Sequence, residues 1–401
     1  MYNLHLTPEQ LEFRDTVRGF VNDEVKPVTL KADRLDLADR TLPVDVLRKA
    51  SQMGLRTLAL PEDLGGVGAD ALTCCIVIEE LAAGDTDVAA VIAETAALSL
   101  RLFASMTTEQ GERFLQKFLE DDDCHLACAE REPEADTALG INYHRPASGE
   151  RRLATTATRS GNDVIINGVK DHVANAAVAR LIAVEAQTDK GPALILVPHD
   201  TPGLTIAPPS GTRWHHGAHG RIELKDCRVQ AGNLIALGSA PDAGRAIPFN
   251  EAVNIGIGRA AYEAAVEYAK LRVQGGRPIA QHQAIGTKLT DIAIRLDVAR
   301  TMIWRAAWAA DHPDAFADRS LPDLPLSTIA KVTTAEAVYR ATKDAAECFG
   351  AMGVMRDMPP QKYIHDARVC LYSGDGAADD RLRIAEAVTQ YRRGAPVLAA
   401  E

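Results

Sequence analysis

The sequence has no apolar run long enough to cross a membrane, which takes about 18 or more such residues in succession. Its first residues lack both the basic region and the long apolar region of a secretory signal. Basic residues are also few: 44 Lys and Arg stand against 55 Asp and Glu, and the net charge of -11 argues against a general nucleic-acid binder. We therefore predict a cytoplasmic protein that acts without a membrane or a nucleic acid.

The cysteines show no framework for disulfides. There are seven, an odd number scattered along 401 residues, which is typical of reduced thiols. Cys124 and Cys128 form a C-x3-C pair, but no second ligand pair lies near them, so small buried side chains are favoured over a metal site. His215, His216 and His219 also lack carboxylates or cysteines at matching positions. The sequence therefore predicts no metal site.

Three segments of different character are present. Residues 1–120 have helical periodicity, and the first helix opens with a capping box formed by Thr7 and Gln10. Short β-like runs between turns fill residues 121–235 and favour a small barrel or sandwich. Helical periodicity returns in residues 236–401, in Ala-rich stretches at about 242–272, 283–311, 325–349 and 377–397. This pattern predicts an α+β protein, mostly α, with three domains.

Six short motifs follow one another in a recognisable order. They are 64–68 (LGGVG), 129–137 (AEREPEADT), 167–175 (NGVKDHVAN), 226–229 (DCRV), 272–279 (RVQGGRPI) and 347–353 (ECFGAMG). Together they resemble the acyl-CoA dehydrogenase superfamily, in which the first three read YGGxG, TEPxAGSD and NGxKxWITN. The resemblance implies an N-terminal α domain, a middle β-barrel domain and a C-terminal four-helix bundle, with FAD as the cofactor.

The resemblance places the adenine half of FAD against the last two motifs. Arg272 would bind the pyrophosphate through its guanidinium, with Gln274 and Glu347 in the same two motifs. Gly350 and Gly353 would let backbone amides approach the dinucleotide, although both could simply end a helix. In this family the 347–353 loop serves a neighbouring subunit. The resemblance therefore implies a homo-oligomer, either a dimer or a tetramer.

Departures from the family pattern gather around the flavin ring. Arg131 stands where the family has the Thr of TEP, and Thr137 stands where it has a Ser. His172 and Ala174 replace the Trp and the Thr beside the flavin N5. Arg131 could stabilise an anionic reduced flavin, and His172 could supply a proton near neutral pH. His172 could instead be a strand residue whose polar atoms are bonded by backbone.

The segment DARVCLYSGD, which begins at Asp366, lacks a residue that the family needs. Family members carry a Glu after the Tyr of this segment, and that Glu removes a proton alpha to a thioester. Here the position falls on Ser373 or Gly374. Neither side chain can act as a carboxylate base, so the usual dehydrogenase reaction requires another group.

Two other carboxylates lie near positions from which a relocated base could act. In some family members the Glu lies on the first bundle helix, and counting from the matching motif places that position on Ala246. Glu251 is five residues further along, about a turn and a half around the helix, and so points in another direction. A shift of one residue would bring Asp375 into the place of the missing Glu, although the flanking sequence aligns without a gap.

These departures favour a two-component flavin monooxygenase that receives reduced FAD from a reductase, adds oxygen at C4a and oxidises a small organic substrate. Such chemistry needs a dry pocket and polar groups rather than a thioester base, and we predict Arg131, His172 and Ser373 as its catalytic residues. Two alternatives remain open. One is an acyl-CoA or acyl-carrier-protein dehydrogenase with a relocated base, and the other is a base-lacking subunit of a heteromeric acyl-CoA dehydrogenase.

Overall fold

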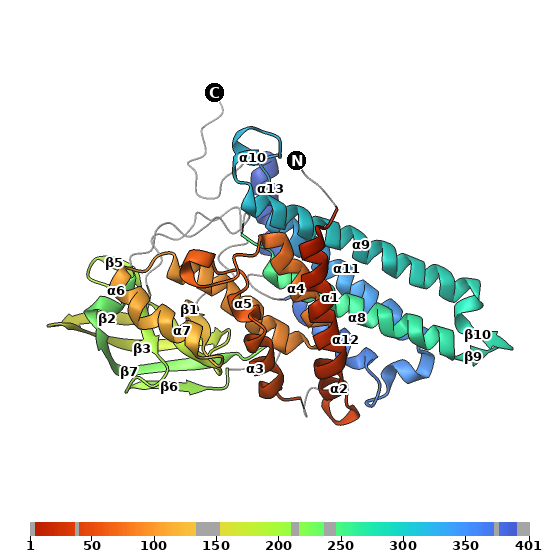
Figure 1. The fold of residues 1–401 in the computed structure, drawn as a ribbon, viewed down its shortest axis with the longest axis horizontal. Helices are drawn as coiled ribbons and strands as arrows, with labels where there is room; N and C mark the ends of the chain where they lie inside the picture. The colour runs from red at the N-terminus through yellow and green to blue at the C-terminus, as the bar shows by residue number, and fades with distance from the viewer. Residues whose placement is uncertain are drawn as a thin grey trace.

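The computed structural model describes residues 5–36, 40–133, 153–209, 216–235, 246–372 and 377–390. The chain passes from helices into a sheet and then back into helices, as the sequence predicts. Figure 1 shows the sheet at one end of the molecule and the long bundle helices extending toward the other end. None of the helices in these ranges is both long and apolar enough to span a bilayer.

The N-terminal part is helical, and its first helix begins where the sequence predicts. The Thr7 hydroxyl accepts the N–H of Gln10, while the Gln10 side chain accepts the N–H of Thr7, which completes the capping box. The helices are α1 (Pro8–Phe20), α2 (Lys26–Thr29), α3 (Val44–Gln52), α4 (Ala71–Gly84), α5 (Thr86–Phe103), α6 (Thr108–Gln110) and α7 (Gln116–Glu120).

The middle part is one sheet, in which β1 pairs parallel with β4 and the remaining strands follow the order β6-β7-β3-β2-β4-β5-β8. The strands are β1 (His125–Ala129), β2 (Thr156–Ser160), β3 (Asp163–Val173), β4 (Ala179–Thr188), β5 (Gly191–Pro198), β6 (Leu204–Ala207), β7 (Gly220–Gln230) and β8 (Leu234–Ile235). Successive side chains along each strand point to opposite faces of the sheet, so the two faces belong to two different hydrophobic cores. Ile182 and Ile195 face the core of the sheet itself, whereas Leu181 and Leu194 pack with Leu102 and Phe118 of the helices.

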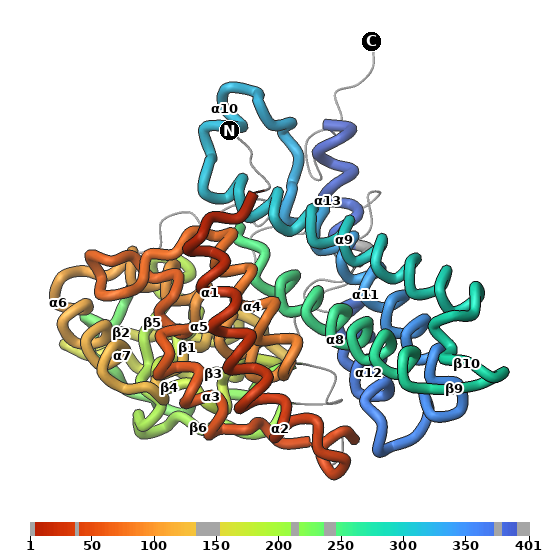
Figure 2. The backbone as a smooth tube through the Cα atoms, turned by 45° about the vertical axis from the view of Figure 1, so that its right-hand side comes forward, coloured from red at the N-terminus to blue at the C-terminus, as the bar shows by residue number. Residues whose placement is uncertain are grey.

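The C-terminal part contains long helices in the four stretches that the sequence predicts, although the first begins at Phe249 rather than near residue 242. Two further helices, Asp314–Ala317 and Pro360–Cys370, were not predicted. The elements are α8 (Phe249–Leu271), β9 (Val273–Gln274), β10 (Arg277–Pro278), α9 (Gln283–Asp311), α10 (Asp314–Ala317), α11 (Leu326–Cys348), α12 (Pro360–Cys370) and α13 (Ala377–Thr389). Figure 2 shows α8, α9 and α11 running side by side toward the β9–β10 hairpin. Helix α12 packs against α8 and α11.

The N-terminal helices and the bundle share one hydrophobic core, since buried residues of α4, α5, α8, α9, α11 and α12 belong to the same cluster. Buried charges also join them. Glu80 on α4 accepts two hydrogen bonds from Arg259 of α8, at 2.6 and 2.7 Å, and Glu79 accepts from Arg300 of α9 at 2.8 Å. The predicted boundary near residue 120 thus separates elements in sequence, but the two helical parts pack together. The division into three domains stays a prediction.

Candidate functional site

Lys170 on β3 anchors the turn that follows β1. Its side chain has no exposed surface, and its Nζ donates to Glu132 Oε1 over 3.1 Å and to the carbonyl oxygen of Glu130 over 3.3 Å. Glu132 also accepts the N–H groups of Ala154 and Thr155, at 2.9 and 2.8 Å. Burial alone would raise the pKa of Glu132, but these hydrogen bonds lower it to about 2. The turn is therefore held to β3 by an ionised carboxylate.

Arg131 and His172, both predicted for the flavin ring, lie on neighbouring stretches of backbone. The carbonyl oxygen of Arg131 accepts the N–H of Asp171 over 3.0 Å, and Asp171 Oδ1 accepts the N–H of His172 over 2.8 Å. His172 has φ of 53°, a left-handed conformation that is uncommon for a residue other than glycine. The exposed Arg131 guanidinium makes no hydrogen bond or ion pair with the described residues. Ala174, two residues after His172, is half-buried.

Asn175 fastens this end of β3 to helix α5. Its Nδ2 donates to the carbonyl oxygens of Val91 and Leu126, at 3.0 and 3.2 Å, and to Thr95 Oγ1 at 3.2 Å. Thr95 Oγ1 also lies 3.2 Å from Nδ1 of His125 on β1. Burial lowers the pKa of His125 to about 4, so this histidine is neutral at physiological pH. The turn of α5 from Val91 to Thr95 is thus fixed against β1 and β3.

Glu94 belongs to that turn of α5, and the sequence analysis missed it. Desolvation and the negative charge of Glu130 raise the pKa of Glu94 to about 7, against the opposing effect of Arg101. Arg101 Nη2 lies 2.8 Å from Glu130 Oε1, and the Cys128 thiol donates to the same oxygen over 3.5 Å. One signal was present in the sequence: Glu94 is the only acidic residue between Val88 and the end of α5.

Arg272 and Gln274 lie at the opposite end of the bundle, where α8 enters the β9–β10 hairpin. Both side chains are exposed, and the Arg272 guanidinium has no partner among the described residues. His282 Nε2 lies 2.9 Å from the carbonyl oxygen of Gln274. One turn before Arg272, Tyr268 stacks on Phe349 with ring centroids 4.3 Å apart. This contact brings the end of α11 to the same place.

The 347–353 segment lies at the same end of the bundle as Arg272 and Gln274, and its glycines have local structural reasons. Glu347 is exposed and forms an ion pair with Lys288 at the start of α9. Gly350 has φ of 57° just after α11, a left-handed position that favours glycine at a helix end. A Cβ on Gly353 would lie 2.4 Å from the carbonyl oxygen of Ala346, so no side chain fits there.

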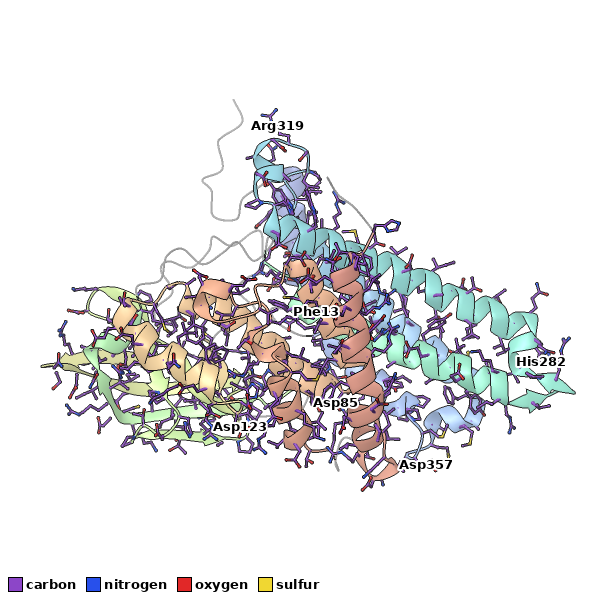
Figure 3. All side chains as sticks on the ribbon, in the orientation of Figure 1. Phe13, Asp85, Asp123, His282, Arg319 and Asp357 are labelled. Carbon is purple, nitrogen blue, oxygen red and sulfur yellow. The ribbon has the colours of Figure 1, made fainter. Side chains whose placement is uncertain are left out.

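The predicted site residues thus form two groups rather than one. Arg131, His172 and Ala174 lie where the sheet meets α5, whereas the second group lies at the hairpin end of the bundle (Figure 1). Figure 3 labels Asp123, just before β1, and His282, beside the hairpin, far apart along the molecule. An unpaired guanidinium in each group fits an anionic dinucleotide such as FAD. Thr137 and Ser373 lie outside the described residues.

Helix α12, which leads toward Ser373, is anchored by a buried carboxylate. Asp366 accepts hydrogen bonds from Arg40 Nη1 at 2.6 Å, Lys362 Nζ at 2.8 Å and Thr86 Oγ1 at 3.2 Å, and its backbone oxygen lies 2.9 Å from His216 Nε2. Burial opposes ionisation, yet Lys362 and Arg40 hold the pKa of Asp366 well below its usual range. The anchor joins α12 to α5 and to the loop before β7.

Glu251, which the sequence analysis weighed as a relocated base, lies inside the bundle. Its side chain is only 7% exposed, and burial raises its pKa to about 7. Lys331, which pairs with Asp380 over 2.7 Å, is close enough to oppose that rise. One turn further along α8, Asn254 Oδ1 accepts the thiol of Cys370 over 2.9 Å. Glu251 therefore faces α11, α12 and α13 rather than the Arg131 group.

Within the described residues, the predicted site is marked neither by a metal cluster nor by the surface cavity beside α1. No cluster of three or more His, Cys, Asp or Glu side chains within them is arranged to hold a metal ion. A surface cavity of about 300 Å³ lies between α1 and the segment that follows α3, and none of the predicted site residues lines it. Its lining is Glu9, Glu12, Phe13, Thr16, Val17, Met53, Leu55, Leu58 and Val67.

Comparison with known proteins identifies the family of the chain. Family models described as the acyl-CoA dehydrogenase N-terminal, middle and C-terminal domains match residues 7–122, 147–227 and 249–388. A probable acyl-CoA dehydrogenase of Bacillus subtilis, YngJ, is 31% identical over 96% of this chain and 98% of its own.

Two solved structures share the fold over nearly the whole chain. Butyryl-CoA dehydrogenase from Megasphaera elsdenii, 24% identical, covers 97% of this chain and 100% of its own with a TM-score of 0.79. The prolyl acyl carrier protein oxidase AnaB, 22% identical, covers 96% of this chain and 100% of its own with a TM-score of 0.79. The chain therefore belongs to the acyl-CoA dehydrogenase family of flavoprotein oxidoreductases, whose cofactor is FAD.

Proposed function

We propose that this protein is an FAD-dependent oxidoreductase of acyl thioesters, carried on coenzyme A or on an acyl carrier protein, and that each FAD is completed by a second chain. The observation that carries the proposal is the separation of the two groups of cofactor residues. The names of its relatives, which include acyl-CoA dehydrogenases and an acyl carrier protein oxidase, support the thioester class.

The separation is large on the scale of one cofactor. Helix α8 has 23 residues and is therefore about 34 Å long at roughly 1.5 Å per residue, and Arg272 stands at its far end. One extended dinucleotide is too short to reach from Arg272, at the far end of α8, to Arg131 and His172 at the sheet. Arg131 and His172 of one chain and Arg272 of another would hold the two halves of the same FAD.

Each group suits its half of the cofactor chemically. Arg272 offers a planar, permanently charged fork to a pyrophosphate, and Gly353 leaves backbone accessible where any side chain would clash. Arg131 offers a positive charge at the ring end, where reduction adds negative charge. FAD supplies the acceptor for two electrons in this site. The protein orients the acyl group, excludes water and takes up the proton that the oxidation releases.

Anaerobic mixing of the FAD-loaded protein with acyl-CoA and acyl-carrier-protein thioesters tests the proposal. Loss of the long-wavelength flavin absorbance with one thioester class, but not with the free acid, is expected. No bleaching with any thioester, in a preparation whose FAD is readily reduced by dithionite, would contradict it.

The two-component monooxygenase remains a second candidate, because helix α12 and the residues that follow it up to Tyr372 place no carboxylate beyond Asp366. Arg131 and His172 could then steady an oxygenated flavin. Mixing the protein with reduced FAD, oxygen and small aromatic or amine substrates distinguishes the two. Stoichiometric product oxygenation would favour the monooxygenase, whereas rapid peroxide release without product would count against it.

A base-lacking subunit of a heteromer is the third candidate, and the unpaired Arg272 supports it, since that residue could complete the FAD of a sister chain. Expression alone and with neighbouring gene products distinguishes it from a homo-oligomer. A colourless protein that turns yellow only on mixing with a sister chain would favour the heteromer, whereas a yellow homo-oligomer would exclude it.

A further inference from the structure

Glu94 projects from the part of α5 that is fixed beside the Arg131 group. The helix turn that carries it is held by the Asn175 side chain, which donates to Val91 O over 3.0 Å and to Thr95 Oγ1 over 3.2 Å. Asn175 itself follows Ala174 and lies three residues after His172. The backbone of Glu94 therefore has a defined position relative to the segment predicted to lie beside the flavin N5.

The Glu94 carboxyl group is also next to the turn that contains Arg131. The negative charge of Glu130, the residue before Arg131, raises the pKa of Glu94. The positive charge of Arg101, two turns further along α5, lowers it. Arg101 is occupied by Glu130 over 2.8 Å. Glu94 makes no hydrogen bond or ion pair with the described residues and is partly exposed, so its oxygens remain accessible to a substrate.

The other described carboxyl groups that titrate near neutrality are engaged elsewhere. Asp87, with a pKa of about 7, accepts the N–H of Gly217 over 2.9 Å and lies in the buried network around Asp366. Glu251 lies in the bundle beside Lys331. Of the three, only Glu94 interacts electrostatically with Glu130, the residue before Arg131.

We propose that Glu94 accepts the α-proton of the acyl thioester, in place of the carboxylate missing after α12. This inference rests on the proposed function. The α C–H bond breaks, its electron pair forms the new carbon–carbon double bond, and the proton passes to a Glu94 oxygen. The β-hydrogen leaves with two electrons as hydride to oxidised FAD, so the acyl group is oxidised and FAD is reduced.

The surroundings of Glu94 suit this role. A base is most effective when its pKa lies near the working pH. Desolvation together with the charge of Glu130 raises the pKa of Glu94 to about 7. Arg101 pairs with Glu130 and lowers the pKa of Glu94, which would otherwise be higher. Once Glu94 holds the substrate proton it is neutral, which removes the repulsion with Glu130.

The test compares Glu94→Gln and Glu94→Asp with Glu251→Gln, a carboxyl group of similar pKa outside the site. Full-length protein, loaded with FAD, is mixed anaerobically with the thioester that bleaches the wild type. Glu94→Gln should slow flavin reduction by about 100-fold or more, with unchanged thioester affinity. Glu94→Asp should retain part of the rate, and Glu251→Gln should stay within a few-fold of wild type. The wild-type rate should rise as pH passes through about 7, and Glu94→Gln should lose that rise.

A second measurement does not depend on turnover. Infrared titration of the cofactor-free protein should show protonated-carboxyl absorption that disappears near neutral pH, to which Asp87, Glu94 and Glu251 all contribute. Glu94→Gln and Glu251→Gln should each remove a different component of that absorption, and a spectrum unchanged in Glu94→Gln would contradict the ionisation assigned to Glu94. Wild-type flavin reduction that is unchanged in Glu94→Gln, or lost in Glu251→Gln instead, would overturn the role of Glu94 and leave the proposed function standing. A wild type that no thioester reduces would overturn both.

Discussion

Lys170 Nζ lies 3.1 Å from Glu132 Oε1, and the lysine side chain is fully buried. This pair connects the turn after β1 to β3, the two segments that carry Arg131 and His172. A buried ion pair gives little net stability compared with an apolar pair, but removing one partner is costly because the other charge is left without its match. The pair therefore has a measurable structural role beside the predicted flavin ring.

Lys170→Met should lower the free energy of unfolding at pH 7 by roughly 2–4 kcal/mol. The pKa of Glu132 is depressed in the folded protein, so the stability it contributes is present above its ordinary pKa and is lost as pH falls toward 2. The difference between wild type and variant should accordingly shrink in acid. Denaturant titration at neutral and acidic pH measures the stability loss and its decrease in acid. Lys225→Met is the control, since Lys225 is 84% exposed. Equal losses in the two variants would contradict the role of Lys170.

Arg272→Ala should weaken FAD binding by about tenfold or more, since a charge-assisted hydrogen bond is worth roughly 1.5–3 kcal/mol. Arg272→Lys should recover only part of the affinity, because a lysine lacks the planar fork. Arg272 is exposed and pairs with none of the described residues, so neither variant should alter thermal unfolding of the apoprotein. Fluorescence titration with FAD measures the affinity, and Lys190→Ala, in the exposed turn between β4 and β5, is the control. Wild-type affinity in Arg272→Ala would place the pyrophosphate elsewhere.

The left-handed backbone of His172 should make glycine the better tolerated small residue there. His172→Gly should be more stable to denaturant than His172→Ala by about 1 kcal/mol, because the left-handed conformation penalises a Cβ. Thr156 on β2 is exposed and extended, so the order should reverse there, with Thr156→Ala above Thr156→Gly. The same order at both positions would contradict the strained conformation.

Glu251→Gln should stabilise the protein above neutral pH. The folded pKa of Glu251 is raised to about 7, so between its ordinary pKa and 7 the unfolded state ionises while the folded state does not. This penalty grows as pH rises and is complete above about 7. We expect the variant to exceed the wild type by roughly 1–2 kcal/mol at pH 8 and to match it below about pH 4. A gain that is the same at every pH would point to a packing effect.

Part of the site could be predicted from the sequence, because some features are local. Thr7 and Gln10, only three residues apart, mark the start of α1, and the motifs place Arg272 and Gln274 at the end of a helix. Helix α12 was missed because Asp366, a charged residue, occupies a core position in its pattern. The charge is buried only because Arg40 and Lys362 meet it there, and Arg40 is 326 residues away along the chain.

The sequence by itself determined the order of helices and strands and the family, since periodicity, caps and motifs are local properties of the chain. That the usual carboxylate after α12 is missing stays a prediction from the same local motif. The tertiary structure decided which charges meet. It placed Glu94 within the electrostatic influence of Glu130 and Arg101, put Arg272 at the hairpin end of the bundle, and enclosed Glu251. Ionisation depends on burial and on neighbours that the chain brings together only when it folds, and so no local pattern could have indicated which carboxyl group titrates near neutral pH.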